Sequence, residues 1–189
     1  SRIKSELFAK AAAGVFAANG IKVYFFNDIA PTPLLSFAVR ELHASAGIVI
    51  TASHNPKEYN GYKVYGNDGC QITTQVAKDI QDQIQTVDTF EVEYVAASSA
   101  FASGMLESVD NRIYEDYLSA VRSQSCLYDA DIDKNVSIVY TPLNGTGFKP
   151  VTDVLKSSGY SNITVVEAQR EPDGNFPACP KPNPEERSA

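Results

Sequence analysis

Several residue types are scarce in this sequence, and each scarcity narrows the class of protein. Its 189 residues include no tryptophan, one methionine and three cysteines. Cys70, Cys126 and Cys179 are odd in number and lack metal-site spacing, which favours reduced thiols in a cytoplasmic protein. The longest apolar runs are only a handful of residues, as at 47–50, so we expect no membrane span. The first residues predict an amphipathic helix rather than a signal peptide.

Basic residues are also in deficit. Sixteen lysines and arginines face 23 acidic residues, which gives a net charge of −7. An acidic surface disfavours general binding to nucleic acid or to anionic membranes, although a single basic pocket could still hold an anion. The 43% of hydrophobic residues is enough for a packed core and argues against disorder. The length fits one domain or two small ones.

The first part of the chain alternates helical and strand patterns. The expected helices and strands occupy residues 3–16, 21–26, 34–42 and 47–51. This order implies right-handed crossovers and a mainly parallel sheet with helices on both faces. Two β-rich runs, 62–65 and 70–73, flank the turn residues 66–69 and predict a hairpin, which makes the sheet mixed. A polar surface helix at 75–86 and an alternating strand at 89–95 follow.

We place a domain boundary near residue 106, where a small, weakly patterned stretch ends. Residues 1–106 form the first α/β domain in this interpretation, and 107–189 form part of a second, similar one. The second begins with a helix around 113–121, capped by Ser108 or Asp110. A strand at 136–140, a glycine-bearing loop, a helix around 151–155 and a strand at 162–166 come next. The proline-containing end shows no period and resembles a connection to a further segment.

The segment at 51–63 carries the strongest chemical signal. It follows a buried strand, and ligands of open α/β sheets gather outside the carboxyl ends of strands. Polar side chains crowd there, although an ordinary Asn-Pro turn would also explain them. A hydrolase with adjacent Ser53 and His54 is disfavoured, because neighbours on an extended chain point apart and no G-x-S-x-G motif is present.

Thr51-Ala-Ser-His-Asn-Pro56, followed by Tyr59-Asn-Gly-Tyr-Lys63, closely resembles the active-serine loop of the α-D-phosphohexomutases. Three further matches span the chain. Arg2 is similar to the end of a family Asp-x-Arg strand, and residues 141–147 resemble the T-P-L-H-G-T/V-G loop. Residues 171–177 and 182–185 resemble the segment before the metal loop. The pattern after Asn60 is most similar to the phosphoglucomutase/phosphopentomutase branch.

The resemblance implies a phosphohexomutase domain I-like fold and a phosphoryl-transfer chemistry. Ser53 would carry a phosphoryl group, exchange it with a sugar phosphate and pass through a sugar bisphosphate. Mg²⁺ would neutralise the phosphate, with a phosphate oxygen on Ser53 as one ligand. His54 would sit near the transferring group, and Lys63 would be the general acid/base, although a solvated strand lysine is the alternative.

The remaining loop residues are expected to belong to the substrate-binding loop. Thr51, Asn55, Asn60 and Gly61 make up this set, in which the asparagines hold the loop's shape and Gly61 lets the backbone turn. Gly145 and Gly147 could cradle an anion at the next helix, but a plain strand-to-helix turn fits equally.

Some family features do not appear in the sequence. The D-x-D-x-D-R metal loop is missing, and Asn144 stands where the family often has His. Because the chain starts at Ser1 without Met, we expect a fragment whose aspartate metal ligands lie beyond Ala189 and which has negligible activity alone. Glucose 1-phosphate and glucose 6-phosphate are the expected substrates. The alternatives are mannose or pentose phosphate, or a non-catalytic phosphosugar-binding module.

Overall fold

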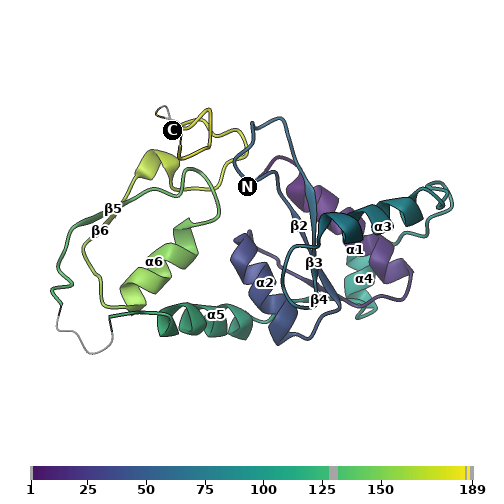
Figure 1. Cartoon of the computed structure of the whole chain (residues 1–189), viewed down its shortest axis with the longest axis horizontal. Helices are drawn as coiled ribbons and strands as arrows, with labels where there is room; N and C mark the ends of the chain where they lie inside the picture. The colour runs from purple at the N-terminus through teal and green to yellow at the C-terminus, as the bar shows by residue number, and fades with distance from the viewer. Residues whose placement is uncertain (1, 128–131, 186, 188–189) are drawn as a thin grey trace.

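The computed structural model describes residues 2–127, 132–185 and 187 as two halves lying side by side (Figure 1). The first half contains α1 (Ser5–Ala18), β1 (Val23–Phe25), α2 (Thr32–Glu41), β2 (Ala46–Ile50), β3 (Tyr62–Gly66), α3 (Thr74–Ile84), α4 (Ala97–Ala102) and β4 (Leu106–Ser108). The second contains α5 (Asn111–Ser123), β5 (Ile138–Tyr140), α6 (Phe148–Ser157), β6 (Ile163–Val165) and a short 3₁₀ helix at Glu167–Gln169. Helix α5 runs along one edge, and the C-terminal segment approaches the N-terminus at the opposite edge (Figure 1).

The described strands pair two by two. Strands β1 and β4 are parallel, as are β5 and β6, whereas β2 and β3 are antiparallel. The α/β class with mixed, mainly parallel pairing is therefore confirmed. The strands are three to five residues long, and they form separate pairs instead of one wide sheet.

The helical periodicities predicted most of the helices correctly. Helix α1 ends just before Gly20, which has a φ of +75° that glycine adopts without strain. Helix α5 is capped by Asp110, one of the two expected caps, because its carboxylate accepts a hydrogen bond of 2.7 Å from the Arg112 amide. Helix α3 follows Thr73, whose hydroxyl accepts from the Val76 amide.

Two strand predictions need correction. The expected strand at 89–95 does not form, and Phe90 is 97% exposed. Its last residue instead donates from the Val95 amide to the Gly14 carbonyl in α1, where a Cβ on Gly14 would collide with Val95. The 66–69 turn is present, but the second arm of the hairpin is reduced to one bridge between Tyr65 and Gln71. Alternation alone does not make a strand when no neighbouring edge is available to pair.

The core consists of two clusters of small and aliphatic side chains. One joins Ala13 and Ala17 of α1 to Ala100 of α4 and Leu106 of β4. The other joins Leu34 and Ala38 of α2 to Ile113 of α5, and the rings of Phe37 and Tyr117 meet beside it at 5.7 Å. The second cluster ties the two halves together along the α5 edge (Figure 1).

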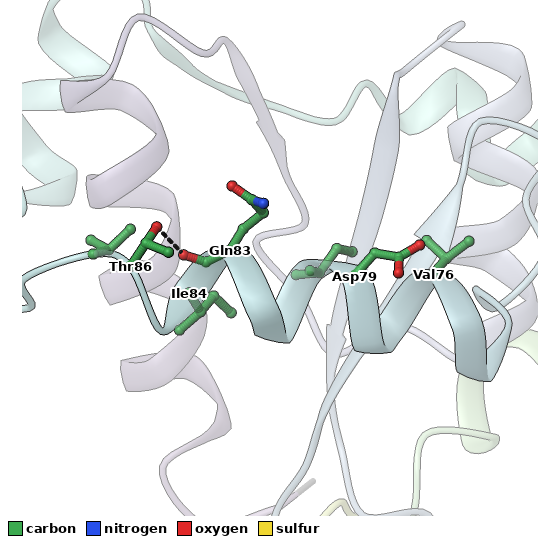
Figure 2. A pocket seen from close by; sticks show the side chains of 7 residues that line it. Val76, Asp79, Gln83, Ile84 and Thr86 are labelled. Carbon is green, nitrogen blue, oxygen red and sulfur yellow. Dashed lines mark hydrogen bonds between the residues drawn. The ribbon is translucent and has the colours of Figure 1, made fainter.

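Helix α3 buries none of its side chains, although one of its faces is apolar. Figure 2 shows this face, which borders a shallow hollow of about 420 Å³. Its lining comprises Val76, Asp79, Ile80, Gln83, Ile84, Thr86 and Val87. The Thr86 hydroxyl donates to the Gln83 carbonyl at 2.7 Å. Within the described ranges, no helix combines the length and the apolar character that a membrane crossing needs.

Candidate functional site

A loop of eleven residues, 51–61, connects β2 to β3 and carries most of the predicted site. Its base is closed by the Thr51 amide, which donates to the Gly61 carbonyl at 2.9 Å. A Cβ on Gly61 would lie 2.6 Å from the Thr51 carbonyl oxygen, so a larger residue would push the two ends of the loop apart. We expected Gly61 to let the backbone turn, but it is not among the residues with positive φ, and the structure gives this close approach as the reason for a glycine.

Ser53 has a left-handed backbone, with a φ of +53°, and an exposed side chain. Such a conformation costs a non-glycine residue about 1–2 kcal/mol, so the surrounding contacts must hold it. One of these contacts is local, since the Ser53 amide donates to the Thr51 hydroxyl at 3.1 Å. The loop therefore uses Thr51 to fix its bend and leaves the Ser53 hydroxyl accessible.

Lys63 reaches Ser53 from the neighbouring strand. Lys63 pairs with Val49 in the β2–β3 ladder, and its Nζ donates to Ser53 Oγ at 2.9 Å. An ammonium group at this distance stabilises negative charge on the serine oxygen and can pass it a proton. The structure thus brings together two of the three residues that sequence reasoning assigned to catalysis.

The carbonyl groups of the same loop converge on Arg2. The guanidinium donates to the carbonyls of Pro56 at 2.7 Å and Tyr59 at 3.4 Å through Nη1, and to those of Ser53 and Asn55 through Nη2. Arg2 is only 6% exposed, and burial lowers its pKa from the ordinary value, an effect that the negative charge of Glu58 partly opposes. Sequence reasoning noted Arg2 only as part of a family resemblance and missed this contact.

The other predicted residues divide by exposure. His54 and Asn55 are exposed, and the His54 side chain makes no hydrogen bond to the described part of the chain. Asn60 instead turns toward the start of α1. Its Nδ2 donates to the Ile3 carbonyl at 3.2 Å and the Ser5 hydroxyl at 3.1 Å, and its Oδ1 accepts from the Gly61 amide. The Asn60 side chain therefore anchors the loop.

The loop at 141–147 follows β5 in the second half. Asn144 is 3% exposed and has a φ of +54°. Its amide donates to the Gln169 carbonyl at 2.7 Å, and its Nδ2 donates to the Glu171 carbonyl at 3.0 Å. Its Oδ1 has no hydrogen-bond partner among the described residues. Asn144 therefore joins its loop to the 169–173 segment.

The residues that the structure describes do not supply a full donor set for a metal. Among residues 2–127, 132–185 and 187, no three His, Cys, Asp or Glu side chains gather where they could hold a metal ion. The side chains hydrogen-bonded to Ser53 are the Lys63 ammonium and the Thr51 hydroxyl, whereas Mg²⁺ prefers carboxylate and phosphate oxygens. The hollow along α3 (Figure 2) contains none of the loop residues either.

Two family models match the chain. Residues 1–91 match phosphoglucomutase/phosphomannomutase, alpha/beta/alpha domain I, and residues 115–189 match domain II of the same family. A phosphoglucomutase of Staphylococcus saprophyticus is 35% identical over 190 residues, covering 100% of this chain and 34% of the relative. A "Probable phosphoribomutase" of Schizosaccharomyces pombe is 38% identical over 196 residues, covering 100% of this chain and 32% of the relative. This chain spans about a third of the length of these curated relatives.

A solved structure shares the fold. The crystal structure of a "putative phosphomannomutase" from Thermus thermophilus has a TM-score of 0.74 and 30% sequence identity. The superposition covers 93% of this chain and 37% of that one. Both described halves therefore have counterparts in one known architecture.

Proposed function

This chain belongs to the phosphoglucomutase/phosphomannomutase family, and we propose that it carries the phosphoryl-accepting serine of a sugar-phosphate mutase. The observation that supports this most directly is the exposed Ser53 hydroxyl with the Lys63 ammonium 2.9 Å away. A serine in a strained, accessible loop beside a cation is suited to forming and releasing a phosphate ester.

The proposed reaction has two steps of phosphoryl transfer. In the first, a sugar hydroxyl attacks phosphorus and gives its proton to solvent, the bond between phosphorus and Ser53 Oγ breaks, and Lys63 gives a proton to the serine oxygen. In the second, Ser53 Oγ attacks the other phosphoryl group of the bisphosphate and gives its proton to Lys63, the bond between that phosphorus and the sugar oxygen breaks, and the sugar oxygen takes a proton from solvent. The phosphate thereby appears to move along the sugar, from position 1 to position 6 of glucose.

The remaining loop residues have supporting roles in this proposal. His54 is exposed next to Ser53 and would donate a hydrogen bond to the transferring phosphoryl group. Asn55 lies in the exposed part of the loop and would contact the sugar phosphate. Thr51, Asn60 and Gly61 fix the loop's shape through the contacts described above.

We further propose that the chain is a piece of a longer mutase, with a first domain up to about residue 106 and part of a second after it. In the complete protein, Mg²⁺ would take an oxygen of a phosphate on Ser53 as one of its ligands. The bound ion would neutralise negative charge on the phosphoryl group during transfer. A cytoplasmic location belongs to the same proposal. Residues 1–189 alone should show negligible mutase turnover in a coupled assay, and rates near those of the complete protein would contradict this.

Phosphopeptide mass spectrometry on the complete protein tests the central proposal. Ser53 should carry phosphate, and that phosphate should exchange with glucose 1,6-bisphosphate. A Ser53 that stays bare under these conditions would instead favour a non-catalytic phosphosugar-binding module. Comparing glucose, mannose and pentose phosphates as substrates addresses the sugar, since curated relatives include both a phosphoglucomutase and a "Probable phosphoribomutase".

A further inference from the structure

Arg2 lies between the two halves of the molecule and contacts both. On one side are the four carbonyl groups of the Ser53 loop. On the other is Phe176, whose ring centroid lies 5.3 Å from the guanidinium carbon. In Figure 1, this is the edge where the C-terminal segment approaches the N-terminus, opposite α5.

The four carbonyls match the donors of the guanidinium in number and arrangement. The terminal nitrogens of arginine carry four N–H groups, and each nitrogen of Arg2 meets two carbonyl oxygens. Two of these carbonyls belong to Ser53, the left-handed residue itself, and to Asn55, two positions later. A lysine has only three donors around a point charge and lacks the planar shape that spans such a set.

Phe176, which contacts Arg2 from the second half, is also buried and conformationally strained. Phe176 is 4% exposed and has a φ of +49°, so its own backbone is held in an unfavourable conformation. Its amide donates to the Asp173 carbonyl, and the Asp173 amide donates to the Asn144 carbonyl. A continuous set of contacts therefore runs from the Ser53 loop through Arg2 and Phe176 to the 141–147 loop.

We infer that Arg2 is a positioning residue, which sets the backbone of the Ser53 loop and couples it to the second half through Phe176. Its four terminal N–H groups are occupied by carbonyls, so Arg2 acts on phosphoryl transfer by placing Ser53 Oγ against Lys63. It does not bind the substrate. This inference deepens the proposed function and rests on it for the kinetic readout alone.

The test uses the complete protein with Arg2→Met, Phe176→Leu and, as a matched control, Arg112→Met. Arg112 is 80% exposed in α5, and its only described ion pair is with Asp116, so its replacement should change neither readout. The first readout is amide hydrogen exchange at Asn55 and Tyr59, which donate to the Ala52 and Pro56 carbonyls inside the loop. Exchange should speed up about tenfold or more in Arg2→Met and less in Phe176→Leu.

The second readout is steady-state kinetics. In Arg2→Met, kcat should fall by about 10²-fold with KM nearly unchanged, since a misplaced reactive group lowers the rate without removing substrate contacts. Guanidinium ions at non-denaturing concentration should restore part of the rate in Arg2→Met, and ammonium ions should not. Phe176→Leu should lower kcat several-fold while keeping the arginine.

The outcomes separate the inference from the proposed function. If wild-type Ser53 is never phosphorylated, the proposed function fails, and the exchange rates at Asn55 and Tyr59 still decide on Arg2. The inference is overturned if those rates are unchanged in Arg2→Met, or if KM rises while kcat stays constant. Should Arg2→Met fail to fold, Phe176→Leu decides, and unchanged loop exchange in that variant would overturn the coupling.

Discussion

The molecule contains two loops with the same local geometry and different contents. In each, a threonine follows a strand, and its hydroxyl accepts a hydrogen bond from the backbone amide two positions later. Thr51 accepts from Ser53 and Thr141 accepts from Leu143, both at 3.1 Å. Both following residues are left-handed, with φ values of +53° and +51°. The same strained bend is thus built twice.

The difference lies in what each bend presents and what holds it. At the first bend, the exposed Ser53 hydroxyl accepts a hydrogen bond from Lys63, and the buried Arg2 donates to the Ser53 carbonyl. At the second, Leu143 replaces the serine, and the next residue buries its amide side chain against another segment. The bend therefore provides only the backbone shape. A reactive site also needs a hydroxyl group on the bend and a cation beside it.

Replacing the residue on each bend should give the largest contrast. Ser53→Ala removes the phosphoryl acceptor, so mutase turnover of the complete protein should fall by about 10⁴-fold or more. Leu143→Ala should leave turnover within a few-fold and reduce only the free energy of unfolding. A coupled assay and chemical denaturation measure the two effects. Turnover that survives Ser53→Ala would remove Ser53 as the phosphoryl carrier.

Lys63 gives the first bend its cation, since its Nζ donates to Ser53 Oγ at 2.9 Å, whereas the apolar side chain of Leu143 has no atom that could accept such a bond. Lys63→Met keeps the length of the side chain and removes the ammonium group from Ser53 Oγ. We expect kcat to fall by about 10²–10⁴-fold, the usual contribution of a proton-transferring group. The free energy of unfolding should change by less than about 1 kcal/mol, since the hydrogen bond is near the surface. Unchanged kinetics would leave Lys63 as a strand lysine.

These two loops also show how far the sequence could lead. Helical periodicity predicted α1, α2 and α5, because each places apolar side chains in one of the core clusters. It also predicted α6. The Ser53–Lys63 pair followed from the family resemblance of the motif. The failed strand at 89–95 shows the limit, since pairing depends on a neighbouring edge that local alternation does not reveal.

Arg2 and Asn144 show the same limit in the site. Each makes its contacts across long sequence separations, 51 to 57 residues for Arg2 and 27 for the side chain of Asn144. Nothing in local spacing specifies which carbonyls such a side chain will meet. Polar residues that are buried by tertiary contacts are therefore the part of the site that only the structure could supply.

Asn144 is the residue by which the second bend can be weakened without touching the first. Asn144→Leu should lower the free energy of unfolding by about 1–3 kcal/mol, because the Glu171 carbonyl loses its buried donor. Asn144→Gly loses the same hydrogen bond but adopts the left-handed backbone freely, so it should cost about 1 kcal/mol less. Denaturant unfolding measures both. If the free energy of unfolding of Asn144→Leu equals that of the wild type, the hydrogen bond to Glu171 does not support the loop.

The smallest expected effect is a loss of stability at acid pH in the second half of the molecule but not at the Ser53 loop. Helix α6, which follows the second bend, is held on α5 by Asp153, which accepts from the Tyr114 hydroxyl at 2.8 Å and from Lys149 Nζ at 3.0 Å. Burial alone would raise the pKa of Asp153, but these two hydrogen bonds and the positive charges of Lys149 and Lys156 together outweigh it and lower the pKa below its ordinary value of 3.8. Burial and the Asp153 carboxylate raise the pKa of Tyr114, so it stays a neutral donor.

Because the folded state prefers the charged form of Asp153, this contribution to stability is fully present above pH 3.8 and is lost as the pH falls through the lower folded pKa. The difference in the free energy of unfolding between wild type and Asp153→Asn should therefore shrink below that pH. It should stay under about 1 kcal/mol, since water screens a partly exposed pair. Tyr114→Phe keeps the ring beneath Lys149 and removes one hydrogen-bond donor to Asp153. Its difference from wild type in the free energy of unfolding should therefore be about half that of Asp153→Asn.

The Ser53 loop should not take part in this effect. Arg2 remains charged throughout this range, and hydrogen exchange at Asn55 should respond equally to acid in wild type and Asp153→Asn. A difference at Asn55 would mean that the support of the second bend also holds the first.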